Sequence, residues 1–434
     1  KKRGLVLERG GHNWTGGALG IDPTDDEADL KSMATETREM IALVGGRRAL
    51  FRDSAANTEL CYSNPGAFAR LVDYVVQYAR QHPEVDYVHF WLADHVGNLC
   101  ECSSCQALSP TDWYVRLVNA ISSEMAVLGC RNKLVFLSYN STRWAPVQER
   151  INGSYNNVVF MFAPYPGCYL HALTDGRCRE PYSHERPPRN EEVQPRTNHL
   201  YRRFLSSWKQ SFEGDSFLFY YHLWIGDSLF CDLSRIVWQD VRRVKGLGLN
   251  GVLSAQPLAV FWPTGLVMSV LAETAWNTDV DLETVATDFL EAAFGDEAAW
   301  VREHLSKLSG CLAPRDPYAH DDLPKNADSM RSALLEAKDA LPYLSGMLSR
   351  AAHESHAKNS VALLIHYNKY AILLLQGQIS FVTGNVEQAM DSVTRAVEYL
   401  MRFEEELFWA TDLSTTRHQM DGLKQMYAVA RANA

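Results

Sequence analysis

Residues 86–105 read DYVHFWLADHVGNLCECSSC and place a carboxylate, Asp94, directly after a run of apolar and aromatic residues. The run 87–93 is too short for an ordinary helix and rich in β-forming residues, which predicts a strand buried on both faces of a parallel sheet. In a (β/α) barrel the active site lies where strands end and loops begin. Asp94 is therefore a candidate catalytic residue, with a helix cap or a loop brace as the structural alternative.

Two further carboxylates are candidates for the same chemistry. Glu101 follows on the same loop between two cysteines, and it is either a second catalytic carboxylate or a solvated loop residue. Glu8 ends the predicted strand 5–8, with His12 close behind, and is a competing acid. A carboxyl group whose pKa is raised by burial can act as a general acid, whereas an exposed carboxylate stays ionised and can stabilise positive charge, so Asp94 suits either role.

The later predicted strands end in neutral polar and aromatic side chains, and the chain is rich in aromatic residues, with 11 Trp and 19 Tyr. Apolar sugar faces stack on aromatic rings, while hydroxyls and amides bind sugar hydroxyls and acetamides. A core residue whose polar end has simply found a partner is the alternative for each. The candidate substrate-binding residues are His12, Trp14, Tyr139, Asn140, Tyr165, Tyr221, His222, Trp224 and Gln256.

Among nine cysteines, four show a suggestive spacing: Cys61, Cys100, Cys102 and Cys105. A pair of thiolates separated by two residues is typical of structural zinc. Four cysteines would close the coordination shell, so the ion would pin the loop to the start of the helix that follows Cys61 without catalysing a reaction. Disulfides and free thiols remain the alternatives. We expect no cofactor for catalysis.

Composition and motifs exclude several classes of function. A net charge of −10 from scattered acids argues against nucleic acid or an anionic membrane as partner. No uncharged apolar run of about 18 residues predicts a membrane span. The chain lacks a Gly-x-Ser-x-Gly nucleophile motif, a phosphate-binding loop and a dinucleotide fingerprint. Its first residues lack the apolar core of a signal peptide. The compartment is undecided: secreted or surface-associated if a signal was removed, otherwise cytoplasmic.

Strand-like and helix-like segments alternate up to about residue 277, which predicts a parallel sheet with helices outside it, a (β/α)8 TIM-type barrel. The predicted strands are 5–8, 87–93, 134–139, 158–162, 217–221 and 251–254. The remaining strands of an eight-stranded barrel would lie before residue 60 or upstream of residue 1. From residue 281 the pattern is helical only. We therefore expect a barrel domain at 1–280 and an all-α bundle at 281–434.

Several motifs together carry a resemblance to a known family. They are the turn Gly45-Gly46-Arg47-Arg48, the Leu-Cys-x-x-Asn-Pro helix start at 60–65, the strand ending in Asp94, the Cys-x-Cys-x-x-Cys loop around Glu101, and the following helix with Asn119. Over about residues 1–260 the chain resembles the bacterial domain of unknown function 4838 group, related to glycoside hydrolase family 163. One departure is His95, where relatives usually have glycine.

This resemblance implies an endo-β-N-acetylglucosaminidase-like enzyme acting on complex N-glycans. It places Asp94 at the end of the fourth barrel strand and makes an oligosaccharide or a glycoprotein glycan the partner. The expected reaction is retaining hydrolysis at N-acetylglucosamine, assisted by the substrate, with Asp94 as the acid or as the carboxylate that orients the acetamido group. An exo-hexosaminidase, an α-glucuronidase-like enzyme and a carbohydrate-binding barrel without catalysis are the alternatives.

Overall fold

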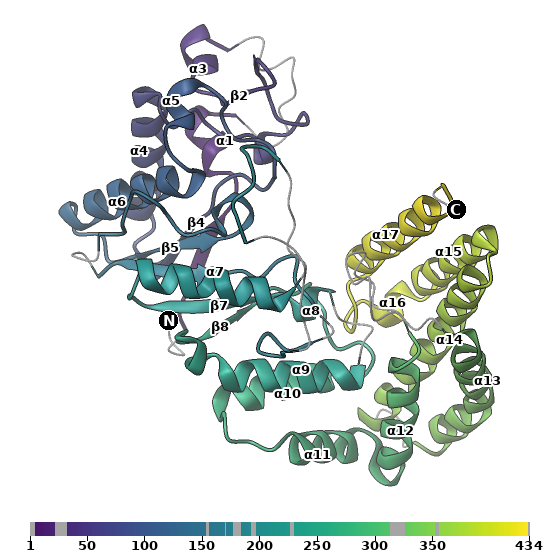
Figure 1. Ribbon diagram of the computed structural model, residues 1–434. Coiled ribbons are helices and arrows are strands. Elements are labelled where there is room, and N and C mark those ends of the chain that lie inside the picture. The colour runs from purple at the N-terminus through teal and green to yellow at the C-terminus, as the bar shows by residue number, and fades with distance from the viewer. Residues whose placement is uncertain are drawn as a thin grey trace.

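The computed structural model of the 434-residue chain describes residues 5–21, 33–152, 156–169, 171–176, 184–191, 197–225, 230–312, 326–351 and 356–432. Its centre is a parallel sheet whose strands lie side by side in chain order and curl into a half-barrel (Figure 1). The strands are β1 (Glu8–Gly11), β4 (Tyr87–Phe90), β5 (Lys133–Ser138), β6 (Val158–Phe162), β7 (Ser216–Tyr220) and β8 (Val252–Ser254).

The mixed α/β class and the parallel sheet confirm the sequence-based prediction, whereas a closed eight-stranded barrel is not present in the described residues. The sheet ends at β1 on one side and at β8 on the other. Apart from β1, the described part of the region before residue 60 adds no strand to it. The two short strands there, β2 (Leu43–Val44) and β3 (Arg47–Arg48), pair with each other as an antiparallel hairpin.

The first strand lies further along the chain than predicted. Instead of ending at Glu8, β1 begins there, and Glu8 is paired with Tyr87 at the amino end of β4. Gly10 explains the shift, because a Cβ on this residue would lie 2.4 Å from the carbonyl oxygen of His89. In the sequence, the pair Gly10-Gly11 is typical of a turn, whereas in the structure it permits close pairing of two strands.

Helices outside the sheet follow the strands, as the alternating pattern predicts. The long helices among them bury one face in the core against the sheet, and two begin at strong caps: Asn64 before Pro65, and Ser109 before Pro110. The helices of this region are α1 (Trp14–Leu19), α3 (Thr35–Glu39), α4 (Pro65–Gln81), α5 (Ser103–Gln106), α6 (Pro110–Val127), α7 (Asn198–Ser211), α8 (His222–Ile225), α9 (Phe230–Arg243) and α10 (Leu266–Trp276), with short 3-10 turns at Ala55–Asn57, Asn140–Thr142 and Lys245–Leu247.

Both faces of the sheet are apolar, which is why its strands read as continuous apolar runs. Along β5, Leu134 and Phe136 point outward into the core beneath the helices. Val135 and Leu137 point inward, into a separate cluster on the concave face. That inner cluster is bordered by aromatic side chains, which continue to the carboxyl edge of the sheet: Trp91, Tyr139, Phe219 and Tyr221.

The C-terminal part is helical and has its own apolar core. Its helices are α11 (Leu282–Phe294), α12 (Ala298–Ser309), α13 (Ala327–Arg350), α14 (His356–Val382), α15 (Val386–Arg402), α16 (Glu404–Leu407) and α17 (Leu413–Ala432), with a 3-10 turn at Gly295–Glu297. Helix α11 belongs to both cores, and a bridge between Val260 and Thr411 joins this bundle to the segment after β8. None of the described helices combines the length and apolarity needed to cross a membrane.

Candidate functional site

Asp94 lies just beyond the carboxyl end of β4, and its side chain is 49% exposed. The Tyr139 hydroxyl, at the end of β5, donates a hydrogen bond of 3.2 Å to the Asp94 carboxylate. The same carboxylate oxygen is 3.6 Å from Nε2 of His12, which follows β1. Three neighbouring strand ends therefore bring an acid, a phenol and an imidazole together, as the carboxyl edge of a parallel sheet predicts.

The orientation of the His12 ring fixes where its protons lie. Its Nδ1 is 2.5 Å from the carbonyl oxygen of Leu92, and a carbonyl only accepts hydrogen bonds, so Nδ1 carries a hydrogen. The nitrogen that faces Asp94 is then an acceptor in the neutral ring and a donor in the charged ring. Together, Asp94 and His12 can hold one proton between a carboxylate oxygen and Nε2.

A row of phenol rings continues from Asp94 along the edge of the sheet. Tyr139 stacks on Tyr165 with ring centroids 6.0 Å apart, and Tyr165 stacks on Tyr221 at 4.7 Å. Burial, together with the nearby Asp94 carboxylate, raises the pKa of Tyr139 well above its usual value. Burial likewise raises the pKa of Tyr221. Both hydroxyls therefore stay protonated and remain hydrogen-bond donors over the whole physiological range.

Two hollows adjoin this edge. A small one beside Asp94 is lined by His12, Tyr139 and the segment 140–142. A larger cavity of about 270 Å³ shares Asn140 and Ser141 with it and continues under the loop after β4. The wall of the larger cavity carries three guanidinium groups and one carboxylate: Arg143, Arg186, Arg189 and Glu191.

Arg186 has one guanidinium nitrogen free for a ligand. One nitrogen, Nη2, donates to the Trp144 and Ala145 carbonyl oxygens and to the Thr111 hydroxyl. The other terminal nitrogen, Nη1, is buried without a hydrogen-bond partner. Burial lowers the pKa of Arg186 to about 10, and the group is still charged at neutral pH. A buried charged donor without an acceptor is costly, and a ligand oxygen in the cavity would supply one.

Sequence reasoning missed Glu59, which is 2% exposed and lies beneath the Asp94 loop. Its carboxyl group accepts a hydrogen bond from the backbone N–H of Ala93 at 2.9 Å and another from the Tyr62 hydroxyl. Burial raises the pKa of Glu59 to about 7. Glu59 therefore positions the residue next to Asp94. Only the tertiary fold brings Ala93 to it, so the local sequence carries no signal for this role.

The other two candidate acids lie elsewhere. Glu8 is at the opposite, amino edge of the sheet, where its carboxylate is 2.9 Å from Nε2 of His89. Both oxygens of Glu101 are held by hydrogen bonds of 2.8 Å, one from the Gly45 backbone N–H and one from the Asn190 amide. The structure thus places Glu101 as a brace between two loops, in contrast to the expected position over the Asp94 pocket.

The remaining predicted binding residues divide between the edge and the core. Trp14 is 6% exposed and donates to the His89 carbonyl oxygen at 2.8 Å. His222 is 5% exposed and stacks on Tyr220. Burial lowers the pKa of His222 to about 3, so it is neutral at physiological pH. Asn140 lines both hollows, whereas Trp224 and Gln256 are exposed after β7 and β8. The structure therefore brings together His12, Asp94, Tyr139, Asn140, Tyr165 and Tyr221, and leaves Trp14 and His222 in the core.

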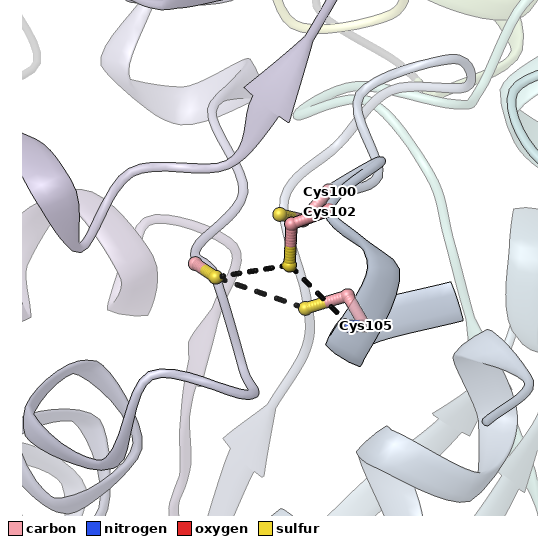
Figure 2. Close-up of side chains that lie close together, drawn as sticks. Cys100, Cys102 and Cys105 are labelled. Carbon is pink, nitrogen blue, oxygen red and sulfur yellow. Dashed lines mark hydrogen bonds between the residues drawn. The ribbon is translucent and has the colours of Figure 1, made fainter. Parts of the chain in front are cut away.

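The four cysteines converge below the same loop. Their sulfur atoms all lie within 4.8 Å of one another. Figure 2 shows Cys100, Cys102 and Cys105 approaching from the β4–α6 connection, and Cys61 completes the group, 3.7 Å from the sulfur of Cys102 and 3.8 Å from that of Cys105. Hydrogen bonds from the thiols of Cys100 and Cys105 lower the pKa of the Cys61 thiol. These residues are the set of side chains in the described part of the chain that could hold a metal.

Comparison with known proteins adds little to this geometry. No family model matches the chain, and no curated protein matches it. The solved structures to which it is similar include glycoside hydrolases. One is a family 138 enzyme targeting pectin rhamnogalacturonan II, at 10% identity and a TM-score of 0.41 over 80% of this chain and 47% of that one. The present chain thus spans about half the length of that enzyme.

Two further similar structures are named as an O-GlcNAc hydrolase mutant and a chitobiase. An O-GlcNAc hydrolase mutant from Thermobaculum terrenum is 9% identical, with a TM-score of 0.35 over 86% of this chain and 79% of that one. The Flavobacterium johnsoniae chitobiase is 11% identical, with a TM-score of 0.33 over 78% of this chain and 57% of that one. With TM-scores below 0.5 at such identities, these similarities assign neither a family nor a function.

Proposed function

We propose that this protein is a glycoside hydrolase that cleaves β-linked N-acetylglucosamine in glycans, with Asp94 as its central catalytic residue. The observation that carries the proposal is the group at the sheet edge: an exposed carboxylate that contacts Tyr139 and His12 and is followed by the stacked rings of Tyr165 and Tyr221. Phenol rings present both an apolar face for a pyranose and a hydroxyl for its polar groups.

A retaining reaction with substrate assistance fits this site best. The Asp94 side chain is exposed to solvent, and its carboxylate accepts a hydrogen bond from the Tyr139 hydroxyl. An ionised carboxylate can accept a hydrogen bond from the acetamido N–H of the substrate and orient its oxygen toward the anomeric carbon. The described polar contacts of Asp94 are to Tyr139, His12 and the backbone, not to a second acid. The substrate's own acetamido group would therefore serve as the nucleophile.

The proton for the leaving oxygen needs a separate source. His12 is the side chain placed to supply it, because Nε2 faces the reaction site and can carry a second proton next to Asp94. Proton transfer by a positioned side chain contributes typically about 10²–10⁴-fold to a reaction rate. In this scheme Asp94 contacts His12 before cleavage and orients the acetamido group during it.

The larger cavity favours a second candidate specificity, for an acidic sugar. Arg186 has an unpartnered buried Nη1, and Arg143 is 1% exposed in the same wall. A uronic acid carboxylate would pair with guanidinium groups better than a neutral sugar would. This observation keeps an α-glucuronidase-like enzyme as the alternative on the same fold, with the cavity as the subsite for the acidic residue.

The test is an activity panel with three proteins: the wild type, Asp94→Asn, and Asp73→Asn. Asp73 is an exposed aspartate on the outer helix α4, so the same substitution there controls for the change of side chain. Substrates are aryl β-N-acetylglucosaminides, aryl glucuronides and N-glycoproteins. We expect release from N-acetylglucosamine substrates by the wild type and by Asp73→Asn, and none by Asp94→Asn. Binding of glycans without turnover by the wild type would instead indicate a carbohydrate-binding protein.

A further inference from the structure

The sulfur atoms of the cysteine cluster are spaced like the corners of a metal-centred tetrahedron. Zinc–sulfur bonds of about 2.3 Å in a tetrahedron put the sulfurs about 3.8 Å apart. The Cys61 sulfur is 3.7 Å from that of Cys102 and 3.8 Å from that of Cys105, and no pair in the group of four exceeds 4.8 Å. A disulfide would need a sulfur–sulfur distance of about 2.05 Å, so these contacts are too long for one.

Backbone N–H groups point at these sulfurs from three directions. Leu43 donates to Cys100 at 3.3 Å, Ser63 donates to Cys105 at 3.4 Å, and Cys105 donates to Cys102 at 3.4 Å. A sulfur is a weak acceptor as a thiol and a much better one as a thiolate. Three such donors converging on one cluster therefore suit sulfurs that carry negative charge, the form in which they bind metal.

Two arginine side chains place positive charge around the cluster. Arg48 interacts electrostatically with Cys61 and Cys100 and also pairs with Glu39 at 3.2 Å. Arg189 interacts electrostatically with Cys105, Cys100 and Cys102. Its guanidinium donates to the carbonyl oxygens of Cys105 and Leu108, at 2.9 and 2.8 Å. Four thiolates around a divalent ion leave a net charge of −2, which two nearby guanidinium groups offset.

The cluster lies where the fold has little other core. Around it, the buried apolar group contains only Ala42 besides three of the cysteines, and the neighbouring strands β2 and β3 have two residues each. Such short elements do not bury enough apolar surface to fix three loops, and metal binding is the usual substitute in small structural units. Cysteines that merely filled a core would not need charged and hydrogen-bonding groups around their sulfurs.

We propose that Cys61, Cys100, Cys102 and Cys105 bind one structural zinc ion, which fixes the loop after β4 against the segment that carries β2 and β3. All four ligands come from protein, so the ion has no open position and no direct part in catalysis. Its role is to order the wall of the large cavity. Asn190 and Arg189, from that wall, bond to Leu99 and Cys105 of the same loop. The metal site is independent of the reaction proposed for Asp94.

The test measures the metal content of the full chain, purified without chelators, by inductively coupled plasma mass spectrometry. We expect one zinc per chain in the wild type and at least a tenfold loss in Cys102→Ser. Cys102 is chosen because it is the least buried of the four, which favours a folded variant. Cys130→Ser is the control, since Cys130 lies outside the cluster, and it should keep its zinc.

A second measurement keeps the proposal testable if Cys102→Ser does not fold. Wild-type protein stripped of metal is titrated with Co²⁺, which should give the intense thiolate-to-cobalt absorption and the ligand-field bands of a tetrahedral site at one equivalent. Wild-type protein that contains no zinc, has four thiols freely reactive and shows no such spectrum would overturn the proposal. One iron per chain in place of zinc would overturn the identity of the ion. Neither outcome depends on whether the protein hydrolyses glycans.

Discussion

The connection between β4 and α6 has two halves that differ sharply in their surroundings. In the first half, Asp94 is about half exposed and its carboxylate contacts the side chains of Tyr139 and His12. In the second half, Cys100 and Cys105 are 3% and 1% exposed and sit in a network of N–H···S contacts. One loop thus combines an accessible reactive group with a tightly held anchor.

The difference indicates that the first half of the loop carries the reactive group and the second half anchors the loop. A carboxylate that must meet substrate has to be accessible, as Asp94 is. Its position must nevertheless be defined within a fraction of an ångström for efficient chemistry. The segments on either side of Asp94 fix its position. Glu59 holds Ala93 on one side, and the cysteine cluster holds residues 100–105 on the other.

The largest effect should come from removing the metal. Chelation of the proposed zinc at neutral pH should lower the melting temperature by on the order of 10 °C, because structural zinc contributes directly to folding free energy. The anchored half of the loop should then exchange its amide hydrogens as fast as the half around Asp94. Differential scanning calorimetry and hydrogen–deuterium exchange, with and without added Zn²⁺, measure both. An unchanged melting temperature in chelator would show that no bound metal ion stabilises this loop.

Glu59→Gln should change how stability depends on pH. The folded protein holds the Glu59 proton more tightly than the unfolded chain, since burial raises this pKa from 4.5 to about 7. Its contribution is fully present below about pH 4.5 and is lost as the pH rises to about 7, a change of roughly 3 kcal/mol. The glutamine variant cannot ionise, so its free energy of unfolding should fall less across this window.

Urea unfolding of both proteins at pH 5 and pH 8 measures the Glu59 effect. Asp240→Asn is a useful control, because burial also raises the pKa of Asp240 to about 7, at a site far along the sheet from the loop. Asp240→Asn should likewise make the free energy of unfolding depend less on pH, without changing activity. Parallel pH profiles for wild type and Glu59→Gln would contradict the proposed burial of the neutral acid.

Tyr139→Phe should have a moderate effect that is confined to the reactive half. It removes the hydroxyl that donates to Asp94 but keeps the ring that stacks on Tyr165. Loss of one hydrogen bond to a charged group corresponds to roughly a tenfold fall in kcat, about 1.4 kcal/mol. The melting temperature should stay close to that of the wild type. Steady-state kinetics and a thermal scan measure the two; a fall in stability without a fall in kcat would assign the hydroxyl a structural role.

The smallest effect should come from Asn190→Ala. The Asn190 amide accepts from the Leu99 N–H and donates to the Leu99 carbonyl oxygen and to Glu101, so it joins the cavity wall to the loop. Its loss should destabilise that contact by about 1 kcal/mol and raise KM more than it lowers kcat. Amide exchange at Leu99, with activity alongside, checks this. Unchanged exchange would show that the wall is held by other contacts.

The elements of the sheet could be predicted where the residues are buried on both faces. Strand β6 has the bounds expected from its apolar run, 158–162, because helices cover one side and the aromatic cluster fills the other. Strand β1 was misplaced, since Gly10 and Gly11 carry no apolar signal and matter only through close contact with β4. The local pattern of apolar residues thus predicts which strands are buried, but it does not predict where two backbones approach closely.

The candidate site was predictable only in part, for a related reason. The rule that parallel strands expose their carboxyl ends on one edge correctly placed Asp94, His12 and Tyr139 together. It gave no information on Glu59 or on the arginine-lined cavity, whose parts meet through long-range contacts. It also misplaced Glu8, because one error in the bounds of β1 moved that acid to the opposite edge.

Turnover of Asp94→Asn tests the claim that the Asp94 carboxylate takes part in the chemistry. The substrates are two aryl β-N-acetylglucosaminides, one with a 4-nitrophenyl and one with a 4-methoxyphenyl leaving group. If Asp94 orients the acetamido group, kcat should fall by about 10³-fold or more on both, with little change in KM. A fall confined to the poorer leaving group would make Asp94 the acid instead. A variant with wild-type kcat on both substrates would contradict the claim.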